Sequence, residues 1–183
     1  IDRMDKNWVF KHRKIRYNKN KYQGVFVMSK QEILVKILIE KGFTISFSES
    51  CTGGKMAGAV VDVSDASKVL NASFVTYSNE AKMKYLNVRS DTLETFGAVS
   101  EQTAKEMAEG VAKANDAEVG VGITGIAGPG GGTAEKPVGT VCFGYCIQGR
   151  TFTETLHFGD LGRNMVRDKS VGHVLDTLIN KLN

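Results

Sequence analysis

The 183-residue sequence is poor in cysteine, histidine, proline and tryptophan, with three, three, two and one residue of each. Three cysteines without a regular spacing exclude the disulfide framework of a small secreted protein. Neither they nor the scattered histidines have the spacing of metal ligands. No apolar run approaches the roughly 20 residues of a membrane-spanning helix, and the first residues lack the apolar core of a signal peptide. We therefore expect a cytoplasmic protein without a metal.

Positive charge is concentrated at the start of the chain. Residues 1–27 carry eight Lys or Arg and two acidic residues, whereas residues 28–183 carry sixteen basic and eighteen acidic residues. The net charge of +4 therefore belongs to the leading segment, and the remainder offers no basic surface for nucleic acid. We interpret residues 1–27 as a basic tail outside the domain. A nucleic-acid-binding arm is the less favoured alternative.

Helical and strand-like patterns alternate from residue 28 onward. We expect helices over residues 29–41, 52–60, 79–86, 101–114 and 166–182, and strands over residues 44–47, 72–77, 119–123, 138–147 and 152–158. Ser100 is the expected N-cap of the fourth helix. Only the last two strands follow one another directly, as a hairpin through residues 148–150. This order predicts one α/β domain over residues 28–183, a three-layer α/β/α sandwich with a mixed, mostly parallel sheet.

One candidate catalytic segment lies between the first expected strand and the second expected helix, with the sequence Glu49-Ser50-Cys51-Thr52-Gly53-Gly54. Ligands of open α/β sheets collect at the carboxyl ends of the strands. A serine at such a position has an accessible hydroxyl, and the neighbouring N–H groups can stabilise an oxyanion. The plain structural alternative is that Ser50 caps the helix that follows.

A second candidate segment follows the next expected strand, with the sequence Tyr77-Ser78-Asn79-Glu80-Ala81-Lys82. A lysine whose pKa is lowered can act as a general base, and serine with a lysine base is a known nucleophile–base pair. The alternative is a solvated Lys82 on a helix capped by Asn79.

A glycine-rich loop is expected over residues 125–137, with five glycines between Gly125 and Gly132. Its successive N–H groups can bind a phosphate or carboxylate; the alternative is a flexible connection. The glycines at positions 120, 122 and 125 also match G-x-G-x-x-G, but they fall within a strand and do not support a dinucleotide site. Arg163, with Arg167 one turn further on, can bind a phosphate or form surface ion pairs.

Several motifs occur together in one order, namely the two candidate segments, Gly97-Ala98-Val99-Ser100-Glu101, Thr124-Gly125-Ile126-Ala127-Gly128-Pro129 and Glu135-Lys136-Pro137-Val138-Gly139-Thr140. Together they resemble the CinA C-terminal domain family, which includes stand-alone nicotinamide-nucleotide amidases. The resemblance implies hydrolysis of nicotinamide mononucleotide to nicotinate mononucleotide and ammonia, in pyridine nucleotide recycling. It implies no cofactor, a small nucleotide substrate, no nucleic-acid or membrane partner, and it leaves room for a homodimer.

The resemblance also implies roles for particular residues. Ser50 matches the nucleophile, and Lys82 and Tyr77 match its proton-handling partners. The residues expected to bind substrate are Thr52, Gly53, Gly54, Thr124, Gly125, Gly128, Gly130 and Arg163. The family pattern before the last helix is Gly-Asp-Arg, whereas this chain has Leu161-Gly162 between Asp160 and Arg163, so the motif does not fix the role of Arg163.

Two other functions remain open from the sequence. Cys51 at a helix start could be the nucleophile of a cysteine amidase, because such a position favours a thiolate. A non-catalytic nucleotide-binding module that serves competence or the DNA damage response is the second alternative.

Overall fold

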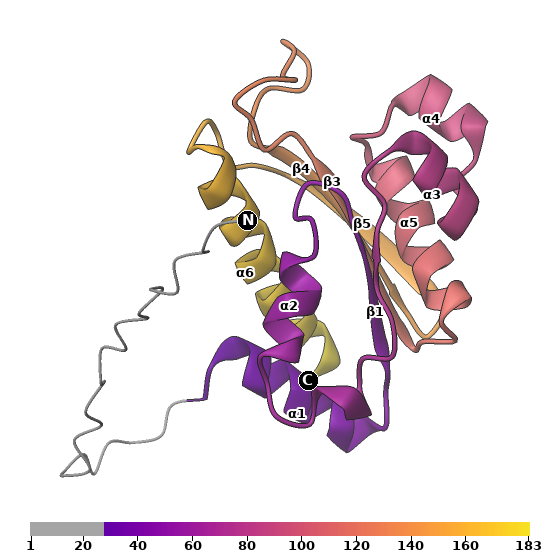
Figure 1. Ribbon diagram of the computed structural model, residues 1–183, viewed down its shortest axis with the longest axis vertical. Helices are drawn as coiled ribbons and strands as arrows, with labels where there is room; N and C mark the ends of the chain where they lie inside the picture. Colours follow the sequence, from indigo (N-terminus) through magenta and orange to yellow (C-terminus); the bar gives the residue numbers. More distant parts are fainter. Residues whose placement is uncertain (1–27) are drawn as a thin grey trace, which may run out of the picture.

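The computed structural model describes residues 28–183, in which five strands and six α-helices form three layers (Figure 1). The expected basic tail, residues 1–27, lies outside the described residues. One face of the sheet is covered by α1 (Lys30–Lys41), α2 (Lys55–Val61) and α6 (Arg163–Leu182), and the other by α3 (Asn79–Leu86), α4 (Ser90–Phe96) and α5 (Glu101–Ala114). No helix in this part of the chain has the length and apolar character of a membrane span.

The sheet has the strand order β2-β1-β3-β4-β5. Its strands are β1 (Ile45–Glu49), β2 (Phe74–Val75), β3 (Val119–Gly125), β4 (Thr140–Ile147) and β5 (Arg150–His157). β1 pairs in parallel with both β2 and β3, whereas β4 is antiparallel to both of its neighbours. Four strands therefore run one way and β4 runs the other, which confirms the predicted fold class. The carboxyl ends of β1, β2 and β3 meet at one edge.

The predicted hairpin and the N-cap of α5 are both confirmed. Gln148 and Gly149 connect β4 to β5 with φ angles of 47° and 76°, the pair of positive values that a type I′ turn needs. The N–H of Thr103 donates to Ser100 Oγ over 3.2 Å at the start of α5.

Several predicted boundaries were wrong. The strand expected over residues 72–77 is reduced to β2, and α4 was not predicted. Ser78, not Asn79, is the N-cap of α3, because its hydroxyl accepts from the N–H of Ala81 over 3.1 Å. α2 begins at Lys55 instead of residue 52, and α6 begins at Arg163 instead of residue 166.

The first two glycines of the G-x-G-x-x-G match allow β3 and α5 to pack closely. A Cβ on Gly120 would lie 2.2 Å from the carbonyl oxygen of Ala108, and one on Gly122 would lie 2.4 Å from that of Ala104. These glycines therefore let α5 lie directly against β3. Larger side chains of the same sheet face α1, α2 and α6, where most of the hydrophobic core is found.

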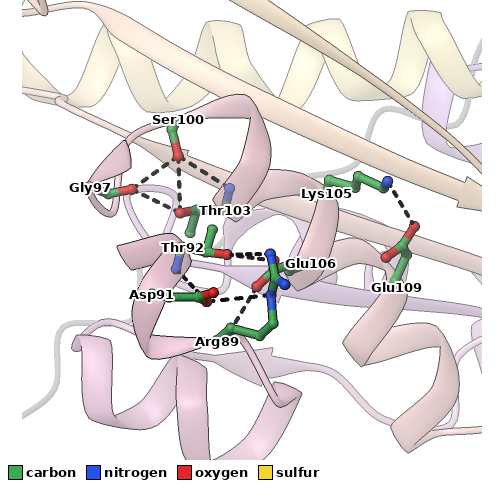
Figure 2. Close-up of polar contacts among 9 residues, drawn as sticks. All are labelled: Arg89, Asp91, Thr92, Gly97, Ser100, Thr103, Lys105, Glu106 and Glu109. Carbon is green, nitrogen blue, oxygen red and sulfur yellow. Dashed lines mark hydrogen bonds and ion pairs between the residues drawn. The ribbon is translucent and has the colours of Figure 1, made fainter. Parts of the chain in front are cut away.

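A polar network joins α4 to α5 (Figure 2). Glu106 accepts from Arg89 Nε over 3.1 Å and from Thr92 Oγ1 over 2.7 Å. At the turn between the two helices, Ser100 Oγ donates to the Gly97 carbonyl over 3.0 Å. These contacts account for the charged side chains in this region, so we assign the network a structural role.

Candidate active site

Ser50 lies directly after the last residue of β1, at the edge where the parallel strands end. Its N–H donates to the carbonyl of Ile123 in β3 over 2.9 Å. The side chain is half-buried. The serine is therefore held by the sheet backbone while its hydroxyl keeps access to the surface.

Lys82 reaches the same edge from α3. Its side chain is 1% exposed, and Nζ lies 3.3 Å from Ser50 Oγ. Nζ also donates to the carbonyl oxygen of Thr76 over 2.8 Å and to that of Tyr77 over 3.4 Å. The two sequence segments thus meet at one serine–lysine contact, and the solvated-lysine alternative is wrong.

The surroundings of Lys82 disfavour a positive charge. Burial lowers the pKa of the Lys82 ammonium below its ordinary value. No ion pair within residues 28–183 involves this lysine. A buried ammonium without a carboxylate is less well compensated than one in an ion pair, so the surroundings of Lys82 make loss of its proton easier than in water.

Glu49 is a site residue that the sequence reasoning missed. Its side chain is 0% exposed, and its carboxylate accepts from the N–H groups of Gly54, Met56 and Ala57 over 3.0, 3.1 and 2.9 Å. A negative charge at a helix start is stabilised by these donors and by the helix dipole. Glu49 therefore fixes the start of α2 immediately beside the nucleophile.

The expectation that the N–H groups at the start of the helix after Ser50 are free to bind an oxyanion is only partly right. The N–H of Lys55 donates to the carbonyl of Thr52, so the first N–H groups of this helix are not available to a substrate. The N–H groups of Thr52 and Gly53 make no hydrogen bond to any acceptor in the described part of the chain. They are donors that lie close to Ser50 in the chain, and Gly53 has a φ of 58° that favours glycine.

Arg163 is placed in the site despite the two extra residues before it. It is the first residue of α6. One guanidinium nitrogen, Nη2, donates to the Tyr77 hydroxyl over 3.1 Å, and the other, Nη1, donates to the Gly128 carbonyl over 3.1 Å. Arg163 therefore links the segment after β2 to the glycine-rich loop. The phenol of Tyr77 contacts this arginine, and its proton-handling role stays a prediction.

The glycine-rich loop is held by hydrogen bonds across its base and to α4. The N–H of Gly139 donates to the Ile126 carbonyl over 2.8 Å, and Lys136 Nζ donates to the carbonyl of Phe96 over 2.7 Å. A Cβ on Gly128 would lie 2.6 Å from Val138 Cγ1. These contacts argue against a loose connection and favour an ordered loop beside the site.

The remaining predicted binding residues lie in and around this loop. Thr124 Oγ1 donates to the Ala98 carbonyl over 2.7 Å. A Cβ on Gly125 would lie 2.7 Å from the Thr140 carbonyl oxygen. Gly130 is exposed at the outer part of the loop, with open space around it. Thr124 and Gly125 thus have clear packing roles, and substrate contacts by these three residues stay predictions.

Cys51 is poorly suited to act as the nucleophile. Its side chain is 6% exposed. Burial raises the pKa of the thiol to about 12, so the thiol stays protonated near neutral pH. The geometry favours the neighbouring serine.

The fold and site define a class of protein, a three-layer α/β domain with a serine and a buried lysine in contact at the carboxyl edge of its parallel strands. The chain belongs to the CinA C-terminal domain family, whose model matches residues 28–182.

Known relatives agree with this assignment. A CinA-like protein from Kosmotoga olearia is 49% identical over 153 residues, which are 84% of this chain and 37% of that protein. The solved structure of a competence/damage inducible protein from Agrobacterium tumefaciens has a TM-score of 0.77 and 41% identity, covering 86% of this chain and 98% of that one. A CinA superfamily structure from Klebsiella pneumoniae has a TM-score of 0.81 and 33% identity, covering 84% of this chain and 95% of that one. The chain thus spans about a third of the length of the curated relatives it matches.

Proposed function

We propose that this domain is an amidase that hydrolyses nicotinamide mononucleotide to nicotinate mononucleotide and ammonia, with Ser50 as nucleophile and Lys82 as base. The observation that carries the proposal is the contact between Ser50 Oγ and Lys82 Nζ at 3.3 Å, made by a lysine that is 1% exposed. A serine needs such a base to become a nucleophile. The family resemblance supports the choice of substrate.

The hydrogen bonds of Lys82 support the direction of proton transfer. A neutral amine has two N–H donors and one lone pair. The carbonyl oxygens of Thr76 and Tyr77 can only accept, so they take the two N–H groups. The lone pair is then left for the proton of the Ser50 hydroxyl. A base held in this way matches the requirement that it lie within reach of the proton it abstracts.

The reaction proceeds in two stages. In the first, Lys82 takes the Ser50 proton as Oγ attacks the carboxamide carbon, and the N–H groups near Thr52 and Gly53 stabilise the oxyanion. The C–N bond then breaks, and the lysine proton passes to the departing ammonia. In the second, water attacks the ester on Ser50, gives a proton to Lys82, and releases nicotinate mononucleotide as Ser50 regains its hydrogen.

Two features support an anionic substrate. The Arg163 guanidinium lies beside Gly128 and Tyr77, and arginine is well suited to a phosphate. The ordered glycine-rich loop adds backbone N–H groups nearby. We assign the ribose phosphate of the substrate to the Arg163 guanidinium and the N–H groups of the neighbouring loop.

Release of ammonia tests the proposal directly. The purified chain is incubated with nicotinamide mononucleotide, nicotinamide riboside, free nicotinamide and glutamine, and ammonia is measured for each. We expect the mononucleotide to be hydrolysed best and the riboside, which lacks the phosphate, to be much poorer. Ammonia from none of these amides would contradict the proposal and favour a non-catalytic nucleotide-binding module.

Variants at neighbouring positions identify the nucleophile. Ser50→Ala should abolish ammonia release while the protein stays folded, because no other hydroxyl replaces Oγ. Cys51→Ala is the matched control and should keep most of the activity. Substantial activity in folded Ser50→Ala protein, or an equally deep loss in Cys51→Ala, would contradict the assignment.

A further inference from the structure

Arg167 contacts the backbone beside the nucleophile. Its Nη2 donates to the carbonyl oxygen of Thr52 over 2.8 Å. The same nitrogen would lie 3.3 Å from a Cβ on Gly53. The guanidinium of this α6 residue is therefore placed against the Thr52–Gly53 peptide, at the turn that follows Ser50.

This contact helps to orient one particular N–H group. The peptide bond between Thr52 and Gly53 is trans, and in a planar trans peptide the C=O and N–H point in opposite directions. The Thr52 carbonyl points toward Arg167 and also accepts from the Lys55 N–H, so the Gly53 N–H must point away from α6. That N–H has no hydrogen-bond acceptor among residues 28–183.

Several N–H groups at the start of α2 are already occupied. Glu49 accepts from the N–H groups of Gly54, Met56 and Ala57. The Gly53 N–H is therefore among the few donors available to a negative charge that forms next to Ser50 Oγ. A cation bound to the carbonyl end of its peptide also polarises that N–H and makes it a stronger donor.

The shape of the turn matches this arrangement. Gly53 has a φ of 58°, which favours glycine, and its bare Cα leaves the room that the Arg167 guanidinium occupies. In addition, Arg167 Nε is buried without a hydrogen-bond partner in the described part of the chain. The guanidinium therefore occupies this position although one of its buried N–H groups lacks an acceptor within residues 28–183.

We propose that Arg167 is a positioning residue for the amidase reaction. Through the Thr52 carbonyl it aims the Gly53 N–H at the oxyanion that forms when Ser50 attacks the carboxamide. The inference rests on the proposed function. It differs from a role in substrate binding, because the guanidinium acts through the peptide and does not touch the substrate.

Steady-state kinetics of Arg167→Gln and Arg167→Lys test this role, with ammonia release measured for nicotinamide mononucleotide and its riboside. Misplacing an oxyanion donor should lower kcat by about 10- to 100-fold with both substrates, while KM and the midpoint of the pH profile stay unchanged. Lysine can still donate to the Thr52 carbonyl, so Arg167→Lys should recover part of the loss. Lys169→Gln, an exposed position on the same helix, is the matched control and should leave both constants unchanged.

Other results would overturn the inference. An unchanged kcat in both variants would show that the peptide does not need Arg167. A rise in KM for the mononucleotide but not for the riboside would make Arg167 a direct ligand of the phosphate. If Arg167→Gln does not give a cooperative thermal transition, Arg167→Lys decides the matter by the same criteria. Wild-type protein that releases no ammonia would instead contradict the proposed function itself.

Discussion

The starts of α2 and α3 lie at the same edge of the sheet, and each buries an ionisable side chain next to Ser50. At α2, the Glu49 carboxylate accepts three hydrogen bonds from the helix backbone. At α3, the partners of Lys82 within residues 28–183 are two carbonyl oxygens and the serine hydroxyl. The Glu49 carboxylate is stabilised by backbone N–H donors at a helix start, whereas burial without an ion pair in the described part of the chain lowers the pKa of the Lys82 ammonium and makes the amine a better proton acceptor.

Removing the lysine should have the largest effect of any change at these two helix starts. Lys82→Met should lower kcat/KM by about 10²- to 10⁴-fold, because Ser50 loses its base. Lys82→Arg should be similarly inactive, since a guanidinium keeps its proton. Ammonia release measures the loss, and urea denaturation checks that the Met variant is at least as stable as wild type. An active Lys82→Arg enzyme would require another base, such as Tyr77.

The pH dependence follows from the lowered pKa of Lys82. Only the neutral amine accepts a proton, so kcat/KM should rise as pH increases through the pKa of the folded state and then level off. Protonation also favours the unfolded chain, where the lysine has its ordinary pKa. As pH falls from the unfolded to the folded pKa, wild type should therefore lose stability relative to Lys82→Met. Activity profiles and urea denaturation at several pH values test both effects, and flat curves would contradict them.

A change at the α2 start should act mainly on stability. Glu49→Gln replaces a carboxylate with a neutral amide whose NH₂ group faces backbone donors, so we expect a loss of about 1–3 kcal/mol in the free energy of unfolding. The loss in kcat should be smaller than that of Lys82→Met. Glu40→Gln, in an exposed pair with Lys36, is the control and should change stability little. Equal free energies of unfolding for Glu49→Gln and Glu40→Gln would contradict the structural role of Glu49.

The smallest effect is expected from strengthening α2 without altering Glu49. Gly58 lies inside this helix, and a Cβ there would have no atom within 4 Å. Gly58→Ala should therefore raise the free energy of unfolding by about 0.5–1 kcal/mol, with kcat unchanged. A thermal melt and the ammonia assay measure the two quantities. A large change in kcat would show that the mobility of α2 contributes to the reaction.

The sequence predicts the order of the main elements because most have a clear apolar period or a strong turn signal. α4 was missed because it is a short helix of seven mostly polar residues. It is stabilised by tertiary contacts with α5, including the Thr92–Glu106 hydrogen bond. The second strand was predicted too long, since the carbonyls of Thr76 and Tyr77 turn toward Lys82 instead of extending the strand.

The site was predictable where chemistry depends on residue type and order, as for Ser50 and Lys82. Glu49 was missed because its role depends on burial and on the direction of three N–H groups. A usable signal was present: the N-cap of α2 is Gly54, which offers no capping side chain, and an acidic residue precedes it by five positions. Arg163 was expected to bind substrate, but the two residues before it left its role unfixed by the motif, whereas in the structure α6 begins at Arg163 and its guanidinium contacts Tyr77 and Gly128.

Trapping the covalent intermediate tests the central claim, that Ser50 activated by Lys82 carries the reaction. A single turnover of nicotinamide mononucleotide is stopped with acid, and the peptides are mapped by mass spectrometry. We predict a transient nicotinate mononucleotide ester on Ser50 in wild type and in Cys51→Ala, and none in Ser50→Ala or Lys82→Met. An adduct on Cys51, or turnover by the Ser50→Ala protein without any adduct, would contradict the serine–lysine account.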